Sequence, residues 1–147
     1  MSDPQMRARV RLKPKADAKR LRHGAPWVYA DDVVLDRRTK ALHPGTIAVL
    51  EDGTRTPLAT VAFNPGSRIA CRVMDADPAA EIGPAWLRTR LGDALSLRER
   101  LFEAPYYRLV HAEGDFLPGL VIDRYGAAAV VQPNAAWADA RRGKGSV

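Results

Sequence analysis

The chain of 147 residues has one cysteine, Cys71, and no long apolar run. A single cysteine excludes a disulfide framework, and it excludes a zinc site built from several thiolates of one chain. No apolar stretch approaches the roughly 20 residues that cross a bilayer, and the first residues lack the apolar segment of a secretory signal. We therefore expect a cytoplasmic protein that does not enter a membrane.

Glycine-rich phosphate-binding loops are also missing. The sequence contains neither Gly-x-Gly-x-x-Gly nor a Walker pattern. A Rossmann-type nucleotide or S-adenosylmethionine enzyme needs a glycine-rich turn from a strand into a helix. The three histidines are far apart and lack metal-type spacing. We therefore predict no metal, no cofactor and no catalytic residue in this chain.

Two features could nevertheless support a complete enzyme. Cys71 could act as a nucleophile, and Glu113, Asp115 and Asp123 could serve as paired carboxylates for acid–base work or metal binding. Cys71 lies in a predicted strand, where a free cysteine often behaves as a small buried hydrophobe. The structural alternative for the acids is that Asp115 caps a turn and Asp123 pairs with a base such as Arg124. We favour the structural alternatives because no nucleophile–base pair is visible.

Positive charge is concentrated near the start of the chain. The net charge is +6 and the sequence pI is about 9.9, and residues 7–22 include eight bases against one acid, Asp17. Clustered basic charge is the electrostatic footprint of nucleic-acid binding, although a solubilising surface has the same composition. In residues 7–13 the bases alternate with apolar side chains, which predicts a half-buried strand with one wholly basic face.

The hydrophobic spacing divides the chain into two regions. Before residue 75 we predict a short helix at 16–22 and strands at 47–50, 58–63 and 69–74, which is typical of a small β-barrel or sandwich. Residues 85–103 then have helical spacing and precede strands at 106–111, 120–125 and 128–132. Arg98 interrupts the apolar stripe of this helix, so it either snorkels or pairs with an acid.

The predicted class is α+β, with domains at 1–75 and 76–137 and a frayed tail at 138–147. The second domain is predicted to be incomplete because nothing after its last strand could cover the exposed sheet edge. A protein-interaction module that dimerises through strand edges at 120–132 is therefore one functional hypothesis.

Three stretches of the sequence together resemble one protein family. They are residues 12–29, residues 62–73 and, most specifically, residues 107–126, which contain Glu-Gly-Asp-Phe-Leu-Pro-Gly. In this order and approximate spacing they resemble the amino-terminal part of the bacterial 23S ribosomal RNA cytosine-5 methyltransferases that begin with a PUA domain. The resemblance covers residues 7 to about 134. The departures are mild: the family commonly has histidine at Ala25 and glycine at Ala112.

The resemblance implies a domain plan. Members of that family combine a PUA domain, a central α/β domain called EEHEAD, and a Rossmann-like methyltransferase domain. Residues 1–75 are then expected to form a PUA-like β pseudobarrel, and residues 76–137 a partial EEHEAD-like domain of one helix and about three strands. S-adenosylmethionine and the catalytic cysteine belong to the third part, so this chain is expected to bind RNA and to be inactive alone.

The resemblance also implies structured RNA as the partner, 23S ribosomal RNA in particular, bound in a groove beside the short helix. Trp27 could stack an unpaired base or pack in the core, and Phe116 is better placed to be exposed. Asn64, Ser67 and Arg68, at a turn, are weaker candidates for ribose or base contacts. The expected phosphate contacts are Lys15, Lys19, Arg20, Arg22 and His23 in the groove, with Arg9, Arg11 and Lys13 on the strand face.

Overall fold

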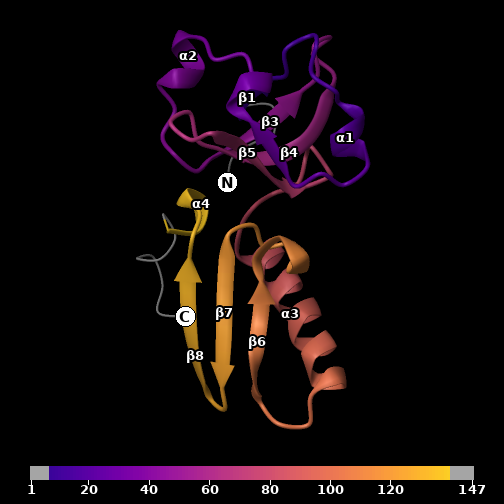
Figure 1. Cartoon of the computed structure of the whole chain (residues 1–147), viewed down its shortest axis with the longest axis vertical. Coiled ribbons are helices and arrows are strands. Elements are labelled where there is room, and N and C mark those ends of the chain that lie inside the picture. Colours follow the sequence, from indigo (N-terminus) through magenta and orange to yellow (C-terminus); the bar gives the residue numbers. More distant parts are fainter. Residues whose placement is uncertain (1–6, 140–147) are drawn as a thin grey trace. The chain divides into compact units, whose positions relative to one another are not determined.

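The computed structural model describes residues 7–139, which form two compact units that divide between Glu81 and Ile82. The first unit is built on a five-stranded sheet with the order β1-β3-β4-β5-β2 (Figure 1). Its elements are β1 (Ala8–Arg11), α1 (Lys19–Arg22), β2 (Trp27–Tyr29), η2 (Ala30–Asp32), α2 (Arg37–Lys40), β3 (Thr46–Glu51), β4 (Pro57–Phe63) and β5 (Ile69–Asp75).

The five-stranded sheet closes on itself. β1 pairs in parallel with β3, and the other neighbouring strands pair antiparallel. The segments that follow the two edge strands then meet, because Leu12 forms a bridge with Val33 and the Val34 amide donates to the Arg11 carbonyl at 2.9 Å. This closure confirms the predicted β pseudobarrel.

Alternation of side chains along β1 separates the barrel core from the basic surface. Val10 and Leu12 are buried in the core with Leu50, Val61 and Phe63. Successive side chains on a strand point to opposite faces, so the bases between these apolar residues face away from the core. Burial of β1 therefore fixes where its arginines lie.

Two short helices connect the strands of the barrel. The helix predicted at 16–22 is a single turn, Lys19–Arg22, and the side chain of Asp17 accepts a hydrogen bond from the Lys19 amide at 2.9 Å. The second helix, α2, was not predicted. It begins with a capping box in which the Asp36 carboxylate accepts the Thr39 amide at 2.8 Å and the Thr39 hydroxyl accepts the Asp36 amide at 2.9 Å.

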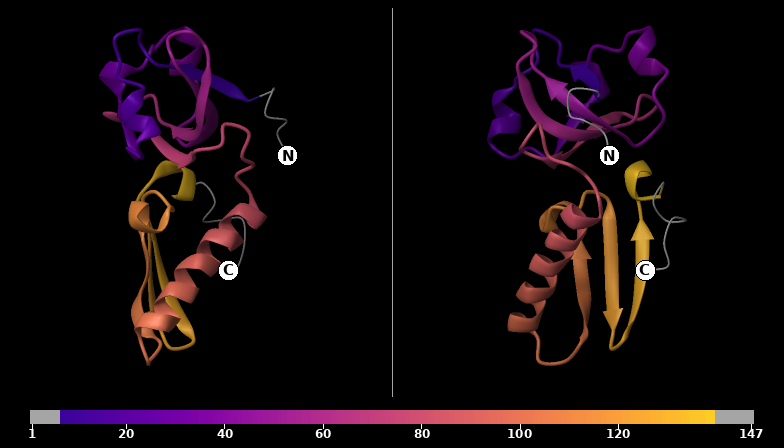
Figure 2. Two further views of the ribbon diagram at one scale, coloured as in Figure 1. Left: turned by 90° about the vertical axis from the view of Figure 1, so that its right-hand side faces the viewer. Right: turned by 180° about the vertical axis from the view of Figure 1, so that it is seen from behind.

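The second unit has a three-stranded antiparallel sheet with the order β6-β7-β8. Helix α3 runs along one face of this sheet (Figure 2). Fully or nearly fully buried side chains between these elements include Ala94 of the helix with Val110 and Leu117. Its elements are α3 (Pro84–Leu101), β6 (Tyr106–His111), η3 (Ala112–Asp115), β7 (Leu120–Tyr125), β8 (Ala128–Pro133) and α4 (Ala136–Asp139).

The chain is thus of the predicted α+β class, with one correction near its end. The tail predicted at 138–147 includes Ala138 and Asp139, which instead close helix α4; Ala138 is buried. Residues 140–147 lie outside the described part of the chain. No helix within residues 7–139 is long and apolar enough to cross a membrane.

Candidate nucleic-acid interface

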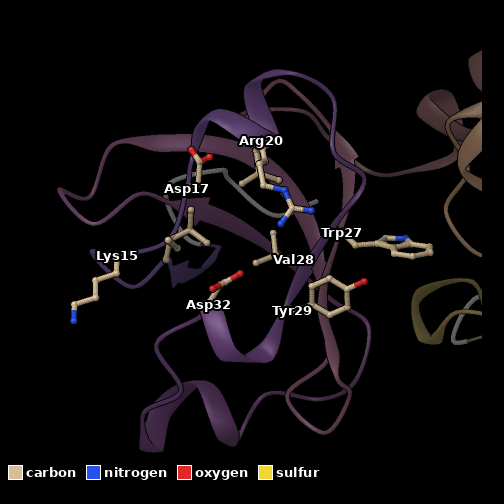
Figure 3. Close-up of a pocket in the computed structure, with 10 residues that line it drawn as sticks. Lys15, Asp17, Arg20, Trp27, Val28, Tyr29 and Asp32 are labelled. Atoms are coloured by element: carbon tan, nitrogen blue, oxygen red, sulfur yellow. The ribbon is translucent and has the colours of Figure 1, made fainter.

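A hollow of about 230 Å³ lies beside α1 in the first unit. Arg20 lines it from the helix, Trp27 and Tyr29 from β2, and Asp32 from η2. Figure 3 shows the Arg20 guanidinium directed toward Val28 while Lys15 extends away from it. The hollow therefore combines aromatic rings, a cation and a carboxylate on elements that the barrel holds in place.

The bases predicted for this groove fall on one exposed segment. Lys19, Arg20 and Arg22 lie on α1, His23 follows it, and all four are exposed, as is Lys15. Two of the five, Lys15 and Arg20, line the hollow.

Carboxylates in the hollow change its expected electrostatics. Asp17 and Asp32 line it together with Lys15 and Arg20, so two acids balance two bases among the lining side chains. The excess of bases on this segment comes from Lys19, Arg22 and His23, which are exposed and do not line the hollow. The sequence interpretation missed Asp32, because nothing local indicates that η2 returns to the end of β1.

The basic face predicted for residues 7–13 is not one surface. Arg7 is buried, and its guanidinium donates to the Thr60 hydroxyl at 3.1 Å and to the Ala80 carbonyl. Arg9 forms an ion pair with Glu51 at 2.8 Å. Arg7 is thus a packing residue, which corrects the expectation of a wholly basic strand face.

Arg9 and Arg11 lie apart from the bases around α1. They line a second hollow, of about 450 Å³, that shares no lining residue with the first. Lys13 is exposed but lines neither hollow. The structure therefore does not gather the predicted RNA contacts at one place on the first unit.

The turn between β4 and β5 holds the weaker candidates. The Asn64 side-chain oxygen accepts the Gly66 amide at 3.1 Å, so this side chain stabilises the turn itself. Ser67 is half-buried and Arg68 is exposed. None of the three candidates, Asn64, Ser67 and Arg68, lines either hollow.

Trp27 and Phe116 occupy different environments. Trp27 is half-buried, and the Arg72 guanidinium lies 5.8 Å from its ring centroid. Phe116 is 69% exposed, as predicted for its loop. The Arg90 guanidinium lies 5.7 Å from the Phe116 ring centroid and donates to the Phe116 carbonyl at 2.8 Å.

The candidate nucleophile is sequestered. Cys71 is fully buried in the barrel, and burial raises the pKa of its thiol to about 12. The thiolate is the reactive form of cysteine, and nucleophilic cysteines lie in partly exposed surroundings that lower the pKa of the thiol. Cys71 has the opposite surroundings, so it does not fit that role.

The acids of the second unit are engaged in structural contacts. Asp115 pairs with Arg98 at 2.7 Å, so of the two alternatives for this arginine, snorkelling or pairing with an acid, the structure has the second. Asp123 pairs with a base, as expected, but that base is Arg108, at 2.8 Å, and not Arg124. The hydrogen bond from Arg108 lowers the pKa of Asp123. Among residues 7–139 no group of three potential metal ligands comes together.

A site for S-adenosylmethionine of Rossmann type lies where a strand turns into a helix through a glycine-rich loop. In the described chain, only β5 leads to a helix longer than four residues, and it does so through residues 76–83 with one glycine, Gly83. A dinucleotide-type loop needs several glycines so that the backbone can approach the ligand at the start of the helix. The described residues therefore do not fit this cofactor.

The closed β-barrel with its short helix and flanking hollow belongs to a recognisable class of domain. Residues 10–76 match the family model of the PUA-like domain. The first unit is therefore a PUA-like β domain, and an α/β unit follows it.

The whole chain is similar to bacterial enzymes. It is 35% identical to a ribosomal RNA large subunit methyltransferase of Deinococcus radiodurans, over 92% of this chain and 34% of that protein. It is 34% identical to ribosomal RNA large subunit methyltransferase I of Alteromonas mediterranea, over 95% of this chain and 35% of that protein. The chain thus spans about a third of the length of the curated relatives it matches.

Solved structures share the fold. A candidate SAM-dependent methyltransferase from Streptococcus mutans superposes with a TM-score of 0.74, 14% sequence identity, and coverage of 92% of this chain and 35% of that one. A candidate methyltransferase crystallised with SAH superposes with a TM-score of 0.73 over 34% of its chain. Both comparisons support the order of a PUA-like barrel followed by an α/β unit.

Proposed function

We propose that this chain is the RNA-binding amino-terminal portion of a ribosomal RNA methyltransferase and does not catalyse methyl transfer by itself. Its partner is structured RNA, 23S ribosomal RNA in the cytoplasm, and the full-length relative is a cytosine-5 methyltransferase that takes S-adenosylmethionine through its remaining part. The observation that carries the proposal is the exposed basic segment around α1, which borders a hollow with two aromatic side chains.

The basic segment suits phosphate contact. Lys19, Arg20 and Arg22 occupy a single helical turn, and all three are exposed. Contacts to phosphate position a protein on RNA without reading sequence, whereas stacking on aromatic rings recognises unpaired bases. Tyr29, which is 39% exposed beside the hollow, is the aromatic ring best placed for stacking.

Reversing two charges on α1 tests this proposal. In K19E/R20E we expect weaker binding to every structured RNA, because two phosphate contacts are lost. The slope of log K against log salt should become shallower by about 1.4–1.8, and affinity at about 0.1 M salt should fall at least roughly 25-fold. Fluorescence anisotropy with a structured fragment of 23S ribosomal RNA across a salt series measures both quantities.

The control for this measurement is R88E/R100E, which reverses two exposed charges on α3 in the second unit. It makes the same change in net charge on the other unit. Equal losses in both variants would mean that only total charge matters. Absence of binding by the natural sequence at low salt would contradict the proposed function.

A second proposal rests on β8. This strand is at the edge of its sheet, and its neighbouring residues Val130 and Val131 are 49% and 45% exposed although they point to opposite faces. An unpaired apolar edge is a template for strand addition. We propose that a second copy of the chain pairs along this edge to form a homodimer.

Sedimentation velocity over a wide concentration range tests the dimer. We expect dimerisation by the natural sequence and a monomer for Val131→Lys, because a lysine on an edge strand opposes pairing. Ala127→Lys, in the turn before β8, is the matched control and should still dimerise. A monomeric natural sequence at the highest concentration would contradict the dimer and leave the RNA proposal untouched.

A further inference from the structure

The second hollow of the barrel collects four arginines from separate parts of the chain. Arg9 and Arg11 line it from β1, Arg38 from α2, and Arg55 from the turn between β3 and β4. The hollow measures about 450 Å³. Sequence spacing could not reveal this group, because its members come together only through the parallel pairing of β1 with β3 and the return of the chain after η2.

The carboxylates in this hollow are already engaged. The side chain of Asp36 accepts the Thr39 amide at 2.8 Å, and this hydrogen bond is the main cause that lowers the pKa of Asp36. Glu51 is largely buried and pairs with Arg9 at 2.8 Å. Four guanidinium groups face two carboxylates, so the lining carries a net charge of +2 (4 − 2).

The remaining guanidinium groups are available to a ligand. Arg38 uses one nitrogen, Nη2, which donates to the Arg9 carbonyl at 3.0 Å, and this contact fixes the side chain over β1. Within residues 7–139, neither Arg11 nor Arg55 has an ion pair or a side-chain hydrogen bond. Arg38 and Arg55 are exposed, and Arg11 is half-exposed.

The turn that carries Arg55 is held in one conformation. The Asp52 carboxylate accepts the Thr54 and Thr56 amides at 2.8 and 2.9 Å. Arg55 itself has φ of 68°, in the left-handed region that residues other than glycine and asparagine seldom adopt. A long cationic side chain is thus presented from a rigid turn rather than from a flexible loop.

We propose that this second hollow binds the phosphodiester backbone of RNA, as a contact separate from the one beside α1. The inference rests on the proposed function as an RNA-binding module. Guanidinium groups present planar pairs of donors that match phosphate oxygens, and an excess of two positive charges suits an anionic ligand. The lining is too polar and charged for an apolar ligand.

The two hollows lie at separate places on the barrel, although residues that are neighbours in the chain line them. Arg11 lines the second hollow and the next residue, Leu12, lines the first, because successive side chains on a strand point to opposite faces. An RNA that engages both places would be held at two separate positions on the barrel. Phosphate contacts at two places fix the orientation of the RNA on the domain, which a single contact cannot do.

Neutralising the two unpaired arginines tests the inference. In R11Q/R55Q we expect the slope of log K against log salt, for the same 23S ribosomal RNA fragment, to become shallower by about 1.4–1.8, with roughly 25–60-fold weaker binding at about 0.1 M salt. R37Q/K40Q is the matched control, since it removes two exposed charges on α2 that do not line the hollow. It should keep the slope of the natural sequence.

A conservative variant keeps the test informative if R11Q/R55Q folds poorly. R11K/R55K retains both charges, so its slope should match that of the natural sequence while its affinity falls through loss of the paired donors. If the natural sequence binds and K19E/R20E weakens binding, but R11Q/R55Q behaves like R37Q/K40Q, the second contact is wrong and the proposed function stands. If the natural sequence does not bind RNA, the proposed function itself fails.

Discussion

Replacing Arg98 with methionine is expected to lower the free energy of unfolding of the second unit by about 3–5 kcal/mol. The guanidinium of Arg98 donates to both carboxylate oxygens of Asp115, at 3.1 and 2.7 Å, and also to the Arg108 carbonyl at 3.2 Å. Both side chains of the pair are under 10% exposed. The variant would leave a buried carboxylate with the His111 amide as its remaining partner.

Urea unfolding followed by tryptophan fluorescence measures this loss. Arg108→Met is the control, because Arg108 pairs with Asp123 at a similar distance but is 45% exposed, and exposed ion pairs contribute little to stability. Adding Asp115→Leu to Arg98→Met should recover most of the stability, since it removes the unpaired charge. If Arg98→Met lowers the free energy of unfolding by less than Arg108→Met does, the structural role of the buried pair is contradicted.

Substituting alanine for Gly119 is the second change with a large expected effect, about 2–4 kcal/mol of the same unfolding free energy. A Cβ at this position would meet the Ala135 Cβ at 2.5 Å and the Ala135 amide nitrogen at 3.1 Å. Gly119 also has φ of 68°, a conformation that strains any residue with a side chain. Close packing and backbone strain therefore act together.

The clash with Ala135 would disturb the start of helix α4. The Gly119 carbonyl accepts the Asn134 amide at 2.7 Å, and the indole of Trp137 donates to the Pro118 carbonyl at 2.7 Å. Moving residue 135 away would disturb both bonds, so the emission of Trp137 should shift toward that of an exposed indole.

Gly126→Ala isolates the contribution of backbone strain. Gly126 has φ of 65°, but a Cβ there would find the Tyr106 hydroxyl at an ordinary 3.6 Å. Its cost should be limited to about 1 kcal/mol. If Gly126→Ala and Gly119→Ala lower the free energy of unfolding equally, the close approach of residue 119 to Ala135 has no cost in stability.

Local patterns were sufficient to predict most of the regular structure. Strands expected at 106–111 and 120–125 have those bounds in the structure, because short runs rich in apolar and aromatic residues, bounded by proline or glycine, indicate them locally. Helix α2 was missed although Asp36 and Thr39 have capping-box spacing, since four residues are too few to show a helical period. The break in the apolar stripe at Arg98 left snorkelling and ion pairing as alternatives, and the choice depended on the fold of the 112–119 loop, which supplies Asp115.

The candidate site was predictable only where its residues are neighbours in the chain. Lys19 and Arg20 share one helical turn, so their common surface follows from the sequence. The grouping of Arg11 with Arg55 depends on long-range pairing, and so does the burial of Arg7. Charge counting treated every base in residues 7–22 alike, and tertiary structure assigns them different roles.

The burial of Cys71 has a practical consequence for spectroscopy. Burial raises the pKa of the Cys71 thiol to about 12, so the thiol stays protonated at neutral pH, whereas maleimide reagents react with the thiolate. The native chain therefore offers no competing label, since it has no other cysteine. A cysteine introduced at an exposed position that lines one hollow, Lys15 for the first or Arg38 for the second, would carry a fluorophore or spin label at that position alone, so each hollow can be monitored separately.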